Sequence, residues 1–517
     1  MKSRQKPKHL WYWREIEIPE NWRGKQIYLC IGAADYHCTG YINGKIVGSH
    51  EGGYTPMAWR IDPCLKKSSN SICLHVEETT NPKLPRGKQT HLPWRYAVFY
   101  KPYSGIWQSV WLEARGMTFV KHVNGVTSND GASFIFQVAI GGDIHGDLRL
   151  ALIHPDGSAD ASITVPIESG QMSVQIQPQR PARWSPHDPN IYQVVCAVEH
   201  DGKVIDRVQS YAGLRTIEIQ NGKVLLNGVP FYQKLVLYQA YYPDGWATAT
   251  EDAVLRADVE LIKSLGFNGL RIHQTLADPR LLYWCDRLGL VVWGEMPSPF
   301  VFARVNRRAF ELLLREALER DLGHPSIISW VLFNETWGIL DIFFSRKSRA
   351  WVRDMIRLCR SLDPTRLIID NSGYDHLETD LLDIHHYLSD PEHIRRLYAA
   401  LANPASLKHR FWRHFYMMAP NRIAKSPLAP TGVYRGEPVI ISECGGYGFG
   451  PYRGKKMGLR ENLEQVIQLI NEFPHLQGFA YTQLHDIEQE RNGLATFDRQ
   501  VKIDPTIIKS IIDRVGN

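Results

Sequence analysis

The chain has 517 residues, of which 44% are hydrophobic and 22% charged, and its formal net charge is +6. This length exceeds what one hydrophobic core normally supports, so three or four domains are expected. The composition is that of a folded globular protein and excludes a disordered or collagen-like chain. Acidic and basic residues are interspersed, without the basic run that would indicate nucleic-acid binding.

The compartment is predicted from the apolar runs and the cysteines. No stretch of about 18 apolar residues indicates a membrane span, and the basic start MKSRQKPKHLWYW lacks the apolar segment of a signal peptide. The eight cysteines show no metal-ligand spacing. We expect reduced, mostly buried thiols, with a Cys64–Cys73 bridge as a minor alternative. These features predict a cytoplasmic protein with neither a nucleic-acid nor a membrane partner.

The first two fifths of the chain are predicted to be all-β. Within residues 1–116, short runs such as QIYLCIGAA and SICLHVEE are rich in β-branched and aromatic residues and alternate with turn residues, which indicates a β-sandwich. Asn43-Gly44 lies between two such runs and predicts a two-residue hairpin. Residues 117–216 continue the alternation, in SFIFQVAI and IYQVVCAVEH, over a length that suits an immunoglobulin-like sandwich.

In residues 217–517 the spacing of the apolar residues changes. Apolar strand-like runs alternate with amphipathic helical patterns such as 251–266 and 307–322, which is typical of parallel β/α architecture. The candidate strands are 231–237, 267–273, 290–295, 327–335, 366–372, 381–387, 438–443 and 478–483. Eight β/α units in this length predict a (β/α)8 barrel. We expect the long connection 388–437 to be a loop over the functional site.

Several of these strands end in carboxylates or other polar groups, where (β/α)8 barrels place their catalytic residues. The residues at these ends are Glu295 (strand three), Asn334 and Glu335 (strand four), His385, His386 and Tyr387 (strand six), and Glu443 (strand seven). Any one buried carboxylate is as often part of a structural salt bridge. Glu335 and Glu443 together are the kind of pair that retaining glycoside hydrolysis requires, with carboxyl groups about 5–5.5 Å apart.

The two carboxyl groups of such a pair must titrate differently. An acid group needs a partly apolar environment, and the aromatic residues near Glu335 in the sequence are Trp330, Phe333 and Trp337. A nucleophile must stay ionised, and the Tyr387 hydroxyl is a candidate hydrogen-bond donor to Glu443.

The segments around both glutamates resemble glycoside hydrolase family 2. SWVLFNETWG is similar to the acid/base segment of that family, and PVIISECGG to its nucleophile strand. Residues 266–297 and 481–499 match the family pattern as well, and ADYHCTGYINGKIVGSHEGGYTPMAWRI resembles its sugar-binding sandwich. The resemblance implies a multidomain protein with a jelly-roll-like β-sandwich, an immunoglobulin-like β-sandwich and a C-terminal TIM barrel.

The resemblance also implies a function: a retaining exo-β-glycosidase, galactosidase-like or uronidase-like, acting on a small glycoside or an oligosaccharide. It makes Glu335 the general acid/base, Glu443 the nucleophile and Asn334 the partner of the sugar 2-hydroxyl. The other substrate-pocket residues that it implies are Arg271, His273, Glu295, His385, Tyr387 and Tyr481, the last in place of a tryptophan platform. No cofactor is expected. A magnesium site like that of large galactosidases in the family is not supported, because Pro297 and Ser298 stand two and three residues after Glu295, and catalysis of this kind needs no metal. The resemblance is compatible with a homo-oligomer.

Some segments depart from the family pattern. Residues 234–245 read KLVLYQAYYPDG instead of an Asn-Arg-His segment, which argues against galactose. Arg491-Asn492-Gly493 lacks the lysine with which glucuronidases hold a uronate, so an acidic sugar would need arginine or histidine side chains of the 388–437 loop. We expect the residues around Glu488 and Glu490 to form a solvated loop. The first sandwich also begins later than in the family, which suggests a chain that is short at its N-terminus.

Two alternative functions stay open. A carbohydrate-binding protein on an inactive enzyme scaffold would usually lack one of the two glutamates, and both are present here. A thiol hydrolase using Cys444 with His385 or His386 lacks an oxyanion-hole motif. The sequence alone does not identify the sugar.

Overall fold

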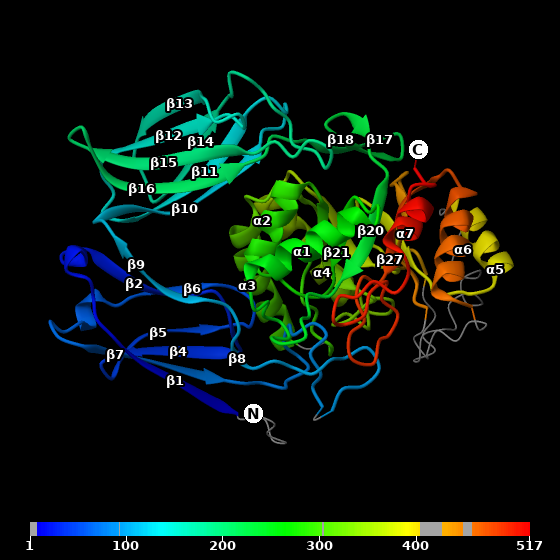
Figure 1. Cartoon of the computed structure of the whole chain (residues 1–517), viewed down its shortest axis with the longest axis horizontal. Helices are drawn as coiled ribbons and strands as arrows, with labels where there is room; N and C mark the ends of the chain where they lie inside the picture. The colour runs from blue at the N-terminus through cyan, green and yellow to red at the C-terminus, as the bar shows by residue number, and fades with distance from the viewer. Residues whose placement is uncertain (1–7, 93, 302–303, 404–425, 448–456, 517) are drawn as a thin grey trace.

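The computed structural model describes residues 8–92, 94–301, 304–403, 426–447 and 457–516. Two β-rich units, coloured blue and cyan to green in Figure 1, precede a helix-covered barrel that the chain follows from green to red. The predicted fold class is therefore confirmed: a jelly-roll-like sandwich, an immunoglobulin-like sandwich and a TIM barrel. None of the helices in the described ranges is long and apolar enough to cross a membrane.

The first unit packs two antiparallel sheets around an aliphatic core. One sheet has the order β1 (His9–Ile16), β7 (Asn70–Glu77), β4 (His37–Ile42) and β5 (Lys45–Glu51), and the other has β6 (Met57–Arg60), β2 (Gln26–Ile31) and β9 (Val110–Arg115). The short strands β3 (Ala34–Asp35) and β8 (Gly105–Ile106) pair beside them, and two 3-10 turns lie at Glu20–Trp22 and Asp62–Cys64. Asn43 and Gly44 both have positive φ, at 51° and 81°, which confirms the predicted hairpin turn between β4 and β5.

The second unit also has two sheets. The strands of one sheet are β10 (Thr118–Thr127), β11 (Phe134–Gly142) and β14 (Gln171–Ile176). Those of the other are β13 (Ala159–Pro166), β12 (Asp147–Ile153), β15 (Tyr192–His200) and β16 (Lys203–Ala212). Alternate residues of both sheets fill the core between them, as the period-two pattern predicts. A small sheet follows, made of β17 (Ile217–Gln220), β18 (Lys223–Leu226) and β19 (Val229–Pro230).

All eight predicted barrel strands belong to one parallel sheet. In chain order they are β20 (Gln233–Tyr238), β21 (Gly269–Ile272), β22 (Val291–Glu295), β23 (Ile327–Asn334), β24 (Leu367–Ser372), β25 (Leu382–His385), β26 (Val439–Gly445) and β27 (Leu476–Thr482). Each strand pairs with its neighbour from β20 to β24 and from β25 through β27 back to β20. The strands β24 and β25 contact each other where the sheet comes close to closing into a barrel.

Seven helices surround the strands within the described residues: α1 (Asp252–Ser264), α2 (Pro279–Leu288), α3 (Arg304–Asp321), α4 (Arg346–Leu362), α5 (Pro391–Leu401), α6 (Leu459–Asn471) and α7 (Pro505–Ile512). One apolar core lies inside the barrel and a second, larger core lies between strands and helices. The connection 388–437 is not wholly a loop, because α5 forms within it; its residues 404–425 lie outside the described residues.

A segment of the first sandwich lies against the barrel. The connection from β7 to β8 leaves its sandwich, and Gly87 N donates to Ser298 O over 3.1 Å while Val301 N donates to Pro82 O over 2.9 Å. Gly87 has φ +57°, and a Cβ there would lie 2.0 Å from the carbonyl oxygen of Gln274. Only glycine allows this close approach, so the position joins sandwich and barrel rigidly. The eight cysteines, all within the described residues, are free thiols.

Candidate active site

Glu335 follows β23 in a strained backbone conformation. Its φ is +50° and that of Thr336 is +63°, in the left-handed region that residues other than glycine rarely adopt. Two hydrogen bonds hold this turn: Glu335 N donates to Ser372 O, and Thr336 N donates to Asn371 Oδ1, each over 2.9 Å. Strain of this kind concentrates at functional sites, where the surrounding structure compensates for it. The Glu335 side chain is 28% exposed, so a ligand at the barrel mouth can reach it.

Glu443 lies on β26 and is held by strong donors. Its side chain is 7% exposed; Arg271 Nη1 donates to its Oε1 over 3.1 Å, and the Tyr387 hydroxyl donates to its Oε2 over 2.5 Å. Burial by itself would raise the pKa of Glu443, but His385, Arg271 and His273 outweigh burial and hold the pKa below its usual value. Glu443 is therefore ionised at neutral pH.

Arg271, the last charged residue of β21, is the centre of the polar network. It is fully buried, and its guanidinium also donates to Glu295 Oε2 (2.9 Å) and to Asn334 Oδ1 (2.8 Å). Burial would lower the pKa of Arg271, but the carboxylates around it, Glu295 first, raise it. Glu295 itself is fully buried and bonded to Arg271 and His273, so it lies beneath the pocket and orients other side chains.

His385 links the two glutamates. Its Nδ1 lies 3.1 Å from Glu335 Oε1 and 3.5 Å from Glu443 Oε1, and its Nε2 lies 2.9 Å from Arg271 Nη1. The two ring nitrogens thus face different partners: Nδ1 faces the two carboxylates, and Nε2 faces the guanidinium.

Three polar residues beneath His385 were not recognised from the sequence. Ser372 and Ser442 both donate hydroxyl hydrogen bonds to Asp383 Oδ2, and Ser372 Oγ lies 3.0 Å from His385 Nε2. Asp383 is fully buried on β25, two residues before His385. The alternation of β25 was the available signal, because residues two apart on a strand share a face.

Some predicted pocket residues face away from the mouth, and these predictions are wrong. Tyr481 is fully buried, belongs to the core between strands and helices, and donates its hydroxyl to Asn462 Oδ1 of α6 over 3.1 Å. It is therefore no platform for a sugar. Trp330 and Phe333 also point outward: Trp330 bonds Asp363, and the Phe333 ring stacks on Phe310 of α3. They pack the helix layer and do not surround Glu335.

Trp337 and the sandwich segment form an aromatic wall next to Glu335. The Trp337 ring stacks on Phe99 with centroids 4.9 Å apart, and Phe300 meets Trp337 edge to face at 5.6 Å. Of the three aromatic residues expected near Glu335, only Trp337 does not pack into the helix layer.

The residues after β27 do not form the solvated loop that we expected. Glu490 is 3% exposed; it accepts hydrogen bonds from Tyr100 (2.9 Å) and Gln483 (3.3 Å), and Lys88 lies 3.5 Å from its other oxygen. Glu488 accepts a hydrogen bond from the backbone of Lys101. This loop therefore docks on the first sandwich.

The geometry of the central group defines its chemistry. One oxygen of Glu335, one oxygen of Glu443 and one nitrogen of His385 lie within 4.8 Å of one another. Such a set resembles a ligand group for a cation, and it also brings two carboxylates close together at the barrel mouth. The buried cation of Arg271 lies next to Glu443 and opposes the entry of a metal ion there.

Fold and site together define a class of protein, the (β/α)8 barrels with two glutamates at the mouth and β-sandwiches in front. Two family models match: "Glycosyl hydrolases family 2" over residues 120–215 and "Glycosyl hydrolases family 2, TIM barrel domain" over residues 217–413. Together they cover more than half of the sequence, and the chain belongs to glycoside hydrolase family 2.

Curated relatives are galactosidases and glucuronidases. The chain is similar to a β-galactosidase of Thermoanaerobacter pseudethanolicus, with 27% identity over 69% of this chain and 47% of that protein. It is also similar to the β-glucuronidase of Rattus norvegicus, with 25% identity over 84% of this chain and 70% of that protein. The chain thus spans about half the length of the first relative.

Solved structures share the fold. The β-D-glucuronidase of Dictyoglomus thermophilum superposes with a TM-score of 0.78 at 19% identity, covering 98% of this chain and 90% of the other. A β-glucuronidase of Ruminococcus gnavus in complex with D-glucuronic acid gives 0.77 at 20% identity, covering 98% and 88%.

Proposed function

We propose that this protein is a retaining exo-β-glycosidase that removes a terminal β-linked sugar by double displacement. The observation that carries the proposal is the placement of Glu335 and Glu443, whose nearest ligand oxygens lie within 4.8 Å at the barrel mouth. Retaining enzymes need their two carboxyl groups about 5–5.5 Å apart, whereas inverting enzymes need room for a water between them.

The two steps assign opposite roles to the glutamates. In the first step, Glu443 attacks the anomeric carbon while Glu335 protonates the departing glycosidic oxygen, which leaves a glycosyl ester on Glu443. In the second, Glu335 takes a proton from water, and that water displaces the sugar from Glu443 with net retention. The lowered pKa of Glu443 supports the nucleophile role, since it must attack as the anion.

Neighbouring groups prepare these steps. Arg271 and Tyr387 hold both oxygens of Glu443, which fixes the carboxylate for attack. Asn334 uses its carbonyl oxygen to accept from Arg271, so its amide NH2 group is the part left for a sugar hydroxyl, in this proposal the 2-hydroxyl. His385 Nδ1 lies between the two glutamates, 3.1 Å from Glu335 and 3.5 Å from Glu443, and holds both carboxylates in place.

The sugar is galactose-like or a uronic acid, the two classes named for the relatives. Two observations bear on the choice. The sequence QKLVLY of β20 and the following QAYYPDG do not contain the Asn-Arg-His segment of galactosidases. Arg491-Asn492-Gly493 lacks the lysine with which glucuronidases hold a uronate. A uronate would then have to be bound by other cationic side chains.

A panel of nitrophenyl β-glycosides tests the proposal: galactoside, glucuronide, galacturonide, mannoside, glucoside and arabinoside, each with wild type, Glu443→Ala and Glu218→Ala. Glu218 is an exposed residue of β17 and serves as the matched control. We expect one sugar to turn over with wild type and control and not with Glu443→Ala, and product NMR to show the β-anomer first.

Initial release of the α-anomer would contradict the retaining mechanism. Binding of a sugar without turnover by folded wild type would instead favour the alternative function, a carbohydrate-binding protein on an inactive scaffold.

A further inference from the structure

A group of histidine and carboxylate side chains lies on the outward-facing side of a sheet in the first sandwich. His9 on β1, Glu77 on β7 and His37 on β4 are aligned across three neighbouring strands, because Glu77 is the register partner of both histidines. His75 precedes Glu77 by two residues and so points to the same face of the sheet. This alignment brings together residues that lie far apart in the sequence.

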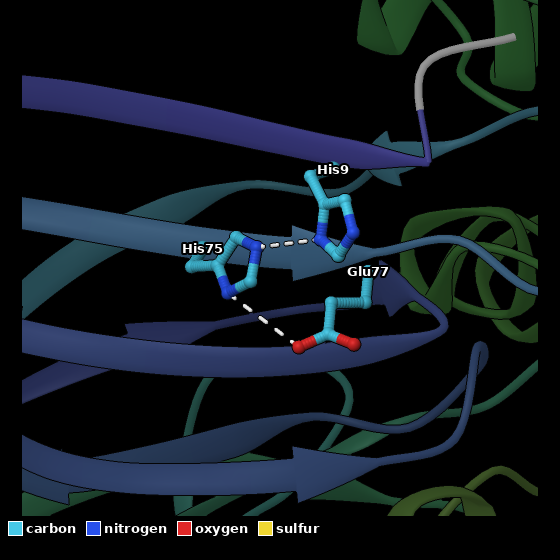
Figure 2. Close-up of side chains that lie close together, drawn as sticks. All are labelled: His9, His75 and Glu77. Carbon is cyan, nitrogen blue, oxygen red and sulfur yellow. Dashed lines mark hydrogen bonds and ion pairs between the residues drawn. The ribbon is translucent and has the colours of Figure 1, made fainter.

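The side chains of His9, His75 and Glu77 lie next to one another (Figure 2). His9 Nδ1 lies 3.1 Å from His75 Nε2, and His75 Nδ1 lies 3.6 Å from Glu77 Oε1. One ligand atom each from His9, His75 and Glu77 lies within 4.8 Å of the others. His37 Nδ1 is 4.0 Å from Glu77 Oε1, which adds a third imidazole at the edge of the group.

Two features show that His75 is held in place. Its ring stacks on Trp11 with centroids 4.1 Å apart and planes 16° from parallel, and its side chain is only 13% exposed. His9 and Glu77 are more exposed, so they can adjust their rotamers around the fixed His75 ring. The fixed His75 ring suits ion capture, because it loses little entropy on binding.

The donor set selects the class of ion. Imidazole nitrogen with one carboxylate is the ligand set of Zn²⁺ and neighbouring divalent transition metals, whereas Mg²⁺ and Ca²⁺ prefer oxygen alone. With Zn–N bonds of about 2.0–2.1 Å, two tetrahedral ligands lie about 3.3 Å apart. The 3.1 Å between His9 Nδ1 and His75 Nε2 is close to that value.

We propose that His9, His75 and Glu77 form a binding site for a divalent transition-metal ion of the Zn²⁺ class, with His37 as an additional ligand. The ion would link β1, an edge strand of its sheet, to β7. Metal binding that is absent in the unfolded chain adds directly to folding stability. The site therefore stabilises the outer edge of the first sandwich and takes no part in catalysis.

The test uses chelator-treated full-length protein and Zn²⁺ alone. Isothermal titration should give one high-affinity Zn²⁺ per chain for wild type, and saturating Zn²⁺ should raise the thermal midpoint of the protein. His75→Ala and His9→Ala should each weaken Zn²⁺ binding by about tenfold or more and abolish the midpoint shift, while glycosidase activity stays unchanged.

Two matched variants locate the ion. His200→Ala removes one histidine of another surface pair, His145–His200, whose rings meet edge to face at 4.7 Å, and it should bind Zn²⁺ as wild type does. Glu443→Gln removes a member of the barrel group and should also keep the site. Absence of Zn²⁺ binding by wild type, binding that survives His75→Ala, or binding lost in Glu443→Gln would each overturn the proposal.

Discussion

Glu335 and Glu443 are the same residue type, and their surroundings give them different chemistry. Glu443 is almost fully buried between Arg271 and Tyr387, whereas Glu335 is partly exposed and lies 3.1 Å from His385 Nδ1. A carboxylate next to a buried cation stays ionised. This asymmetry underlies the role that we propose for each.

The effect of Glu335→Gln on the first step should depend on the leaving group of the substrate. Loss of the general acid should slow glycosides with a poor leaving group by about 10²–10⁴-fold, because such leaving groups need a proton. Dinitrophenyl glycosides, which depart without one, should keep fast formation of the glycosyl-enzyme. Stopped-flow release of the phenol measures this, and Glu443→Gln is the comparison, which should lose the reaction with both leaving groups. Equal losses for both substrates in Glu335→Gln would contradict the acid role.

Tyr387→Phe should shift the acid limb of the pH profile of kcat/KM to higher pH. Wild-type Glu443 has a lowered pKa and must be ionised to attack, so activity should persist below the usual titration range of glutamate. Removing the 2.5 Å hydrogen bond destabilises the anion, so the pKa of Glu443 rises and the acid limb of kcat/KM moves up by about one to two pH units. The basic limb should not move. An unchanged acid limb would show that the hydroxyl does not tune Glu443.

At the scale of elements, the ends of β24 and β25 are joined by a buried ionic group below the site. His376 Nδ1 lies 2.7 Å from Asp370 Oδ1, and its Nε2 lies 3.3 Å from Asp383 Oδ1. Burial would lower the pKa of His376, but the hydrogen bond to Asp370 and the charges of Asp370 and Asp383 raise it to about 9. Because Asp383 also anchors Ser372 and Ser442 beneath His385, this group connects barrel stability to the site.

The raised pKa of His376 predicts a pH-dependent contribution to stability. A histidine whose folded pKa exceeds its unfolded value of about 6.5 stabilises fully below that pH, and the contribution disappears as the pH rises through about 9. His376→Gln should cost about 3–5 kcal/mol at pH 6, since it leaves buried carboxylates unpaired. The difference in thermal midpoint from wild type should shrink by pH 9.5. His187→Gln, at an exposed position, is the control and should show no such trend. A constant difference across this range would argue that His376 is neutral.

At the scale of the whole molecule, the first sandwich completes the mouth of the barrel. Its β7–β8 connection brings Phe99 onto Trp337, and Tyr100 onto Glu490 of the loop after β27. These contacts join the first sandwich to two segments that follow barrel strands. This arrangement gives a physical reason why sandwich and barrel occur together in one chain.

Phe99→Ala should weaken substrate binding more than catalysis. Phe99 contacts four other rings, among them Trp337. Its stack on Trp337 alone is worth about 0.5–1.5 kcal/mol, and a loss of that size in substrate binding is a rise in KM of about 2–10-fold with little change in kcat. Trp94→Ala is the matched control, because Trp94 lies in the same connection and is 63% exposed. Steady-state kinetics on the best glycoside of the panel measures both values. A fall in kcat with unchanged KM would show that Phe99 acts on the position of Glu335 instead.

Local patterns in the sequence were enough for the barrel strands and for the two glutamates at their ends. Apolar runs that end in a charged residue identify a strand end without any long-range information, and the residues around Glu335 and Glu443 resemble a known family. The network around them required the tertiary structure, because Arg271, Asp383 and His385 come from strands whose relative register no local pattern specifies.

Only the tertiary structure decided which face each buried strand residue takes. In a strand that is apolar on both sides, period-two alternation does not tell the barrel interior from the helix layer, so Tyr481, Trp330 and Phe333 were placed on the wrong side. The same limit hid the alignment of His9 with His75 and the docking of Tyr100 on Glu490, which depend on strand register and on contacts between distant segments. Composition and period determine which elements form, and the packing of those elements determines which side chains meet.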